Sequence, residues 1–200
     1  MARKRTNTPE PRMYMRGFVA QCVADHSAKG TFAMDKKLIL DQFAFQRRYI
    51  SVLVDDIPDE KMAVQPGGVV NHPAWQLGHL AAVHDFFTKA LTGQTTLGED
   101  WSKKFGPGSA PSSNRDDYPC KAELLGVFEE RRQALACAFE QAADDTFAKP
   151  NPNARFAKIL PTVGHLMQFG MLFHESTHLG QLASWRKAMG MVPASSKFEP

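Results

Sequence analysis

Residues 174–181 read HESTHLGQ, and the two histidines of this segment stand four positions apart. On an α-helix, four residues advance the chain by about 6 Å and by roughly 40° around the axis. The imidazoles of His174 and His178 can therefore bind one divalent metal ion from the same helix face. Glu175 lies about 100° around the helix from His174 and need not face that ion. The spacing alone is a weak signal, because a metal site also needs a third ligand from elsewhere.

This segment belongs to a long stretch with helical periodicity, which we expect to form a helix from about residue 161 to Met189. Pro161 and Thr162 are typical of a helix start, and Gly190 is typical of a helix end. The stripe that we expect to face inward consists of Met167, Met171, His174, His178, Leu182 and Trp185.

Three earlier stretches also have helical periodicity, at about residues 35–54, 71–92 and 121–143. We expect Asn71 to cap the second helix, with Pro73 in its first turn. Between the second and third helices, residues 94–119 are rich in glycine, proline, serine and asparagine, which predicts a long loop. Loops of this length often cover a functional site. In the first helix, the apolar positions at helical spacing are Leu38, Phe45, Tyr49, Val52 and Leu53.

Long helices without alternating strand patterns predict an all-α four-helix bundle. Residues 1–33 have no helical apolar repeat, so we expect a loose N-terminal extension, and Met34 is a candidate for the true translation start. The expected organisation is therefore an extension at 1–33, a bundle at 34–193 and a C-terminal tail at 194–200.

Composition excludes several classes of protein. Hydrophobic residues make up 43% of the 200 residues, which is enough for a core, and charged residues make up 22%. The net charge is only +3, and much of the basic excess lies in the first sixteen residues, so no nucleic-acid partner is expected. Three cysteines without a CxxC pair fit a reducing compartment. Because no apolar run is long enough for a signal peptide or a membrane span, we expect a cytoplasmic protein with no membrane partner.

The best candidate for the third ligand is His79, midway along the apolar stripe of the second helix. Gly78 precedes it, and a glycine there costs about 1 kcal/mol of helix stability, so it predicts the close approach of a neighbouring helix. His72 shares the stripe but lies nearer the bundle end, whereas His84 and His165 should face elsewhere. A lone histidine on an apolar stripe is more often a core residue, but three that converge predict a metal site. The predicted ligands are His79, His174 and His178.

Gln181, one turn beyond His178, has two possible roles that the sequence leaves open. It could orient a ligand of the metal site, or it could bridge a gap between helices. The three tryptophans are more typical of packing than of a ligand cage.

In these segments the chain resembles the DinB-like superfamily of metal-binding four-helix bundles. The resemblance rests on NHPAWQLGHL at residues 71–80 and HESTHLGQ at residues 174–181, and it covers roughly residues 34–190. It implies up-down-down-up connectivity and frequent homodimers. It also implies one divalent metal ion, zinc or nickel foremost and iron as another choice, bound by His79, His174 and His178.

The resemblance further implies several activities, because some members of the superfamily are transferases that use a low-molecular-weight thiol and others are isomerases. Our leading hypothesis is a metal-dependent thiol S-transferase or a hydrolase that acts on a small-molecule substrate, with a thiol as a possible cosubstrate. The alternative is a metal-binding or scaffold bundle without catalysis. The sequence assigns no catalytic residue beyond the metal ligands.

A zinc protease is a third interpretation, with Glu175 as the base of a His-Glu-x-x-His motif. It needs a third ligand downstream of the motif, and no histidine follows His178. We therefore do not expect a protease.

Overall fold

The structure is a computed structural model that describes residues 34–197. The predictions for the extension at residues 1–33 fall outside the described part of the chain. Within residues 34–197 the regular secondary structure is helical, and the sole β-type pairing there is an isolated bridge between Pro150 and Thr162. The predicted all-α fold class is confirmed.

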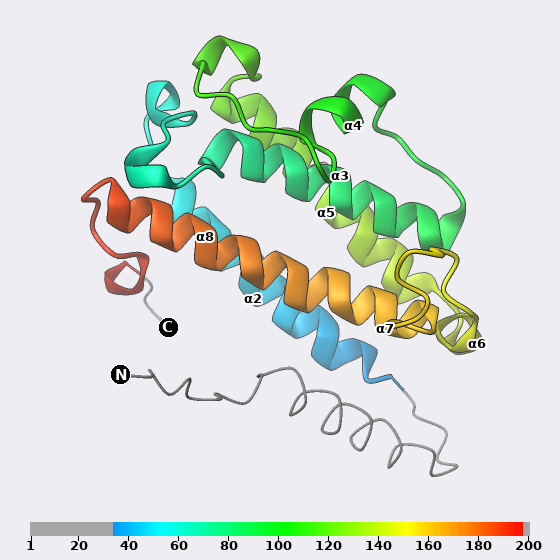
Figure 1. The fold of residues 1–200 in the computed structure, drawn as a ribbon. Helices are drawn as coiled ribbons and strands as arrows, with labels where there is room; N and C mark the ends of the chain where they lie inside the picture. The colour runs from blue at the N-terminus through cyan, green and yellow to red at the C-terminus, as the bar shows by residue number, and fades with distance from the viewer. Residues whose placement is uncertain (1–33, 198–200) are drawn as a thin grey trace, which may run out of the picture. The chain divides into compact units, whose positions relative to one another are not determined.

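Four long helical segments form the bundle in the described part of the chain (Figure 1). Three are α-helices, and the fourth is a continuous run of an α-helix, a π-helical segment and a second α-helix. In chain order they are α2 (Lys36–Val54), α3 (Pro73–Thr92), α5 (Lys121–Gln141), and the run of α7 (Val163–Gln168), η5 (the π segment Phe169–His174) and α8 (Glu175–Ala188). The shorter helices are η2 (Asp59–Lys61), η3 (Pro66–Gly68), α4 (Glu99–Phe105), η4 (Arg115–Asp117), α6 (Asp144–Ala148) and η6 (Ala194–Ser196).

Hydrogen bonds between helices show their relative directions. Helices α2 and α8 run the same way, and α3 and α5 both run the opposite way, as can be followed in Figure 1. The bonded pairs are Gln46–Ser176 and Leu53–Arg186 for α2 with α8, Asn71–Gln181 and His84–Glu175 for α3 with α8, and Phe43–Arg132 and Arg47–Glu129 for α2 with α5.

The cap of α3 differs from the sequence prediction. The N-cap is His72, whose Nδ1 accepts a hydrogen bond from the backbone N–H of Trp75 at 3.3 Å, and Pro73 occupies the first helical position. Asn71 instead reaches across to Gln181. An imidazole nitrogen can accept the same backbone hydrogen bond as an asparagine side chain, and this frees Asn71 for a contact between helices. At the other end, Gly93 has φ 77° and ends the helix, as expected.

The buried face of α2 also differs from the expected one. Leu38 and Phe45 are 53% and 52% exposed. The side chains of this helix that are buried are Ile39, Phe43, Gln46, Ile50, Leu53 and Val54. Apolar residues of α2 occur on more than one face, and only the position of the neighbouring helices decides which face is covered.

The stretch predicted as a long loop contains a helix. Residues 94–119 include α4 and η4, and Phe105 at the end of α4 is fully buried. Glycines and prolines of this stretch flank α4. They correctly indicate turns at the two ends of this helix, but their number led to the prediction of a loop for the whole stretch.

The core contains two apolar clusters and several buried polar residues. One apolar cluster contains Ile50, Leu80, Phe128 and Leu179, and another contains Phe43, Phe87, Leu135 and Met171. Buried polar residues also occur on each of the long helices. They are Gln46 on α2, Gln76, His79, His84 and Asp85 on α3, Arg131 and Arg132 on α5, and Glu175, His178 and Arg186 on α8.

Candidate metal centre

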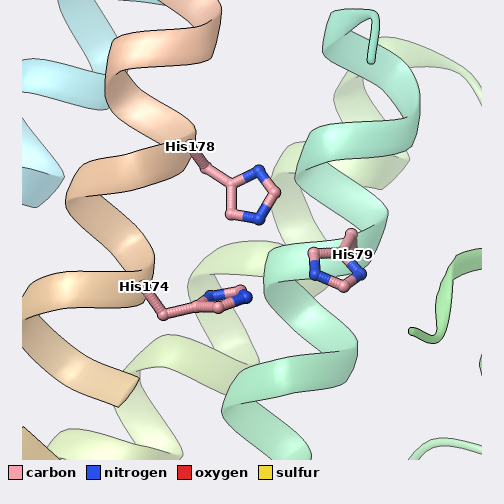
Figure 2. Close-up of side chains that lie close together, drawn as sticks. All are labelled: His79, His174 and His178. Carbon is pink, nitrogen blue, oxygen red and sulfur yellow. The ribbon is translucent and has the colours of Figure 1, made fainter. Parts of the chain in front are cut away.

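Three histidines from two helical segments point toward one another, as Figure 2 shows. His79 comes from the middle of α3, His174 ends the π segment η5, and His178 lies in the first turns of α8. Each offers one ring nitrogen, and these nitrogens all lie within 4.8 Å of one another. The structure therefore brings together the three residues that the sequence singled out, as a set that could hold a metal ion.

The distances between the rings are even. The ring centroids are 5.4 Å apart for His79 and His174, 4.9 Å for His79 and His178, and 4.8 Å for His174 and His178. Zinc–nitrogen bonds are about 2.0–2.1 Å long, so nitrogens on one ion lie within about 4.2 Å of one another. Small side-chain rotations are enough to close the three rings around a metal ion.

Burial keeps the three imidazoles neutral. Together with the positive charge of the neighbouring histidines, it lowers the pKa of His174 to about 4 and that of His178 to about 3. Burial also lowers the pKa of His79, against the opposing effect of its hydrogen bond to Phe105. At neutral pH the rings therefore have unprotonated nitrogens, as metal ligands must.

The carbonyl group of Phe105 orients the ring of His79. The Nδ1 atom of His79 lies 2.6 Å from this oxygen, and a carbonyl can only accept a hydrogen bond. Nδ1 therefore carries the proton, and Nε2 keeps its lone pair for a ligand role. The residue that holds the ring belongs to α4, inside the stretch that the sequence predicted to be a loop over a site.

Gly78 is the reason that α4 can come so close. A Cβ atom on Gly78 would lie 2.3 Å from the ring of Phe105, which is too close for any real contact. The indole of Trp101 also donates a hydrogen bond to the Gly78 carbonyl, at 3.0 Å. The predicted close approach at Gly78 is therefore present, and the neighbour is the short helix α4.

Gln76 orients the ring of His178. Its side-chain Nε2 donates to the Asn71 carbonyl at 2.7 Å, which leaves its Oε1 facing Nδ1 of His178 at 3.3 Å. An amide oxygen can only accept, so Nδ1 of His178 carries the proton and Nε2 is free for a metal. Sequence reasoning missed Gln76, although its place one turn before His79 on a buried helix was a usable signal.

The surroundings of Gln181 bear on the two roles that the sequence suggests for it. Its Oε1 accepts a hydrogen bond from Asn71 at 3.1 Å, which bridges α8 to the start of α3. Its side chain also raises the pKa of His178, against the effect of burial. The two roles that the sequence left open are thus compatible with each other.

His174 lacks a comparable partner. Its Nδ1 is buried and has no hydrogen-bond partner among residues 34–197. Buried polar atoms are normally paired, so an ordinary core role explains this ring poorly. A metal ion bound by the cluster would give this half-buried imidazole a partner.

Trp75 packs against the cluster. Its indole stacks on the His79 ring, with centroids 4.6 Å apart and planes 12° from parallel, and its Nε1 donates to Ser109. The stacking agrees with the packing role expected for Trp75. The indole also shields one face of His79 from solvent.

Glu175 belongs to a separate buried network. Its carboxylate is 2.8 Å from Nε2 of His84 and 3.0 Å from the guanidinium of Arg132, and its side chain is fully buried. The Arg132 guanidinium also donates to the Phe43 carbonyl and stacks over that ring at 3.5 Å. The carboxylate is committed to these partners, so the geometry gives no support to a protease in which Glu175 acts as the base.

The remaining described histidines lie outside the cluster. His72 is 2.8 Å from the Ser112 carbonyl and 3.2 Å from the Tyr118 hydroxyl, and His165 pairs with Thr162. Sequence reasoning placed these two and His84 away from the site correctly, but it did not foresee the pairing of His84 with Glu175.

A comparison with protein families places the chain beside a known superfamily. A model of the DinB superfamily matches residues 42–182, a range that contains all three clustered histidines. A search of curated proteins finds no match. Among residues 34–197, no helix has the length and apolar character needed to cross a bilayer.

Proposed function

Because the chain belongs to the DinB superfamily, we propose that it binds one divalent metal ion through His79, His174 and His178 and uses it on a small-molecule substrate. The observation that carries this proposal is the convergence of three buried or half-buried imidazoles from two helical segments. Zinc and nickel are the favoured ions and iron is a further choice, because imidazole suits all three.

The proposed activity is a thiol S-transferase or a hydrolase. Three protein ligands leave a further coordination position open, which is typical of catalytic sites. A divalent ion held there would supply Lewis-acid activation of a water molecule or of a thiol cosubstrate. The family assignment supports this class of chemistry and does not choose between the two reactions.

The residues around the ion would prepare this chemistry. The Phe105 carbonyl and the Gln76 side chain each hold one imidazole in the tautomer that leaves Nε2 free. Trp75 covers the His79 ring and keeps bulk water from that side. Such orienting contacts commonly change metal affinity by about 10- to 100-fold when they are removed.

Elemental analysis of the purified full chain tests metal binding. We expect about one divalent ion per chain, and its loss in His79→Ala. His165→Ala is the matched control, because this exposed histidine lies outside the cluster and should leave the metal content unchanged. A substoichiometric metal content that is the same in all three proteins would contradict the proposal.

A second assay separates catalysis from simple metal binding. The metal-loaded protein is mixed with an aryl-halide electrophile, in the presence or absence of a panel of cellular thiols, and with ester substrates. Thiol-dependent turnover that His79→Ala abolishes supports a transferase, and thiol-independent hydrolysis supports a hydrolase. A protein that keeps its metal and turns over nothing would favour the non-catalytic scaffold.

The resemblance also implies a homodimer, which we retain as a proposal. Sedimentation equilibrium of the full chain measures it directly, and a monomer mass at micromolar concentration would contradict it.

A further inference from the structure

A surface hollow lies beside α8, the helix that carries His178. It has a volume of about 540 Å³ and lies between the segment before α3 and the outer face of α8, which Figure 1 shows side by side. Pockets for small molecules usually have about 300–1,000 Å³. The hollow is lined by Val69, Val70, Asn71, Thr177, Gly180, Gln181 and Ser184.

The polar wall of the hollow is connected to His178 by two short paths. In one, Gln181 lies one helical turn beyond His178 and raises the pKa of that histidine, against the effect of burial. In the other, the Asn71 carbonyl holds the Gln76 side chain, which in turn faces Nδ1 of His178. The side chains of Asn71 and Gln181, which both line the hollow, also hydrogen-bond to each other. A molecule that contacts this wall would therefore touch the groups that orient a predicted metal ligand.

No packing contact explains why residue 180 is a glycine. It lies within α8, where glycine costs about 1 kcal/mol of helix stability relative to alanine. Its helix needs no left-handed conformation at this position, and a Cβ atom added there would meet nothing within 4 Å. By contrast, Gly78 and Gly170 face aromatic rings that exclude a side chain. The absent side chain at Gly180 leaves open space in the floor of the hollow.

The lining has a distinct chemistry. Its side chains are two aliphatic residues, two amides and two hydroxyls, and none of them is charged. A charged ligand group would find no counter-ion there, whereas amide and hydroxyl groups of a ligand can bond to Asn71, Gln181 and the two hydroxyls. The two valines provide contact area for a short aliphatic segment.

We propose that this hollow is the binding subsite for the uncharged body of the substrate or cosubstrate, a chain of amide and hydroxyl groups with a short aliphatic part. The donor atom of the same molecule reaches the ion at the histidine cluster. This inference rests on the proposed metal site and adds the class of molecule that the site accepts.

Thiol binding to the cobalt(II)-loaded full chain tests the subsite, because a sulfur bound to cobalt produces a charge-transfer absorption band. Three probes are compared. Pantetheine has an uncharged body of amides, hydroxyls and methyl groups, glutathione has a charged body, and 2-mercaptoethanol has almost no body. We expect pantetheine to bind about tenfold or more tightly than either of the others.

Two matched variants locate the effect. Gly180→Leu fills the hollow and should weaken pantetheine binding about tenfold, with little change for 2-mercaptoethanol. Gly126→Leu is the control, since Gly126 is an exposed helical glycine of α5 that also has nothing within 4 Å of an added Cβ. It should change neither affinity.

The outcomes separate the two proposals. If cobalt itself fails to bind, the metal site is wrong and the subsite falls with it. If cobalt binds but pantetheine and 2-mercaptoethanol have equal affinities, or if Gly180→Leu affects both thiols alike, the metal site stands and the subsite is overturned. Tighter binding of glutathione than of pantetheine would likewise overturn the uncharged character of the subsite.

Discussion

The position of His79 depends on two residues that never bind a metal themselves. Gly78 admits the ring of Phe105, and the carbonyl of Phe105 holds Nδ1 of His79 at 2.6 Å. A single methyl group at residue 78 would displace both the aromatic ring and this carbonyl. The glycine therefore links the packing of α4 to the orientation of a predicted ligand.

We predict opposite effects for alanine at two helical glycines. Gly78→Ala should lower the free energy of unfolding by about 2 kcal/mol, because overpacking outweighs the gain in helix propensity. Gly126→Ala, where the added Cβ meets nothing, should raise it by up to about 1 kcal/mol. Urea unfolding of both variants measures this, and equal shifts at the two positions would refute the assigned role of Gly78.

Glu175 is the central residue of the buried network that it forms with His84 and Arg132. It pairs with Arg132, whose side chain is only 5% exposed, and with His84. Removing one partner of a buried ion pair leaves the other charge uncompensated, which is costly. Glu175, which would be the catalytic base of a His-Glu-x-x-His protease, is thus expected to stabilise the fold instead.

We predict that Glu175→Gln lowers the free energy of unfolding by about 3 kcal/mol, the scale for breaking a buried ion pair. Metal content should stay at the wild-type value, because the carboxylate is not among the clustered ligands. The exposed Glu140→Gln on α5 is the control and should change neither quantity. Loss of the metal at unchanged stability would show that Glu175 serves the metal site instead.

At the scale of helices, the π segment η5 is the main departure from the expected regular helix. Phe169–His174 separates α7 from α8, so the predicted single helix is divided. A π segment changes the angular register of residues on its two sides, and such segments are frequent at functional sites. The ring of Phe87 packs against Gly170 within it, which shows a tertiary contact at the irregularity. Angular positions calculated across it for a regular α-helix therefore do not hold.

The ends of α2 and α8 are joined by an ion pair at the opposite end of the bundle from η5. Arg186 is buried and donates to both carboxylate oxygens of Asp56 and to the carbonyls of Leu53 and Val192. Its hydrogen bonds to Asp56 hold the pKa of this carboxyl well below its ordinary value of 3.8. Partial burial opposes this effect, and Lys197 adds to it. Asp56 therefore stabilises the folded protein above that value, and the stabilisation is lost as pH falls through and below it.

We predict that Asp56→Asn lowers stability at pH 7 by about 2 kcal/mol, the scale of hydrogen bonds to a charged group. Because the variant has no carboxyl to protonate, it should also lose less stability than wild type between pH 5 and about pH 3. Chemical unfolding at several pH values measures both effects. Parallel pH profiles for the two proteins would contradict the assigned role of this pair.

For the whole molecule, the predicted metal ion would connect two helical segments across the bundle. His79 belongs to α3, whereas His174 and His178 belong to the η5–α8 run. An ion that binds only the folded arrangement stabilises it by mass action. Metal binding should consequently raise the free energy of unfolding of the whole bundle.

We predict that removing the metal with a chelator lowers the melting temperature by roughly 5–10 °C. This corresponds to about 2.7 kcal/mol at a metal concentration one hundred times Kd, in a domain of this size. His79→Ala should melt at the same temperature with and without metal, whereas His165→Ala should respond as wild type does. Differential scanning calorimetry measures the shifts, and an unchanged melting temperature on chelation of the wild-type protein would count against a metal that bridges the helices.

The amino-acid sequence by itself determined the all-α class, the ends of most long helices, and the three histidines of the candidate site. Local rules suffice for these features, because helix periodicity, glycine stops and a four-residue spacing act within one segment. His79 could be singled out from the sequence because it lies on the apolar stripe of a helix that had to face the core.

Only the tertiary structure decided the rest. The buried face of α2, the approach of α4 to Gly78, the pairing of Glu175 with His84 and Arg132, and the π segment all depend on which elements become neighbours. Residues in these contacts lie far apart in the chain; 91 positions separate His84 from Glu175. Burial and hydrogen bonding between such residues are properties of the packed bundle, so no local pattern in the chain records them.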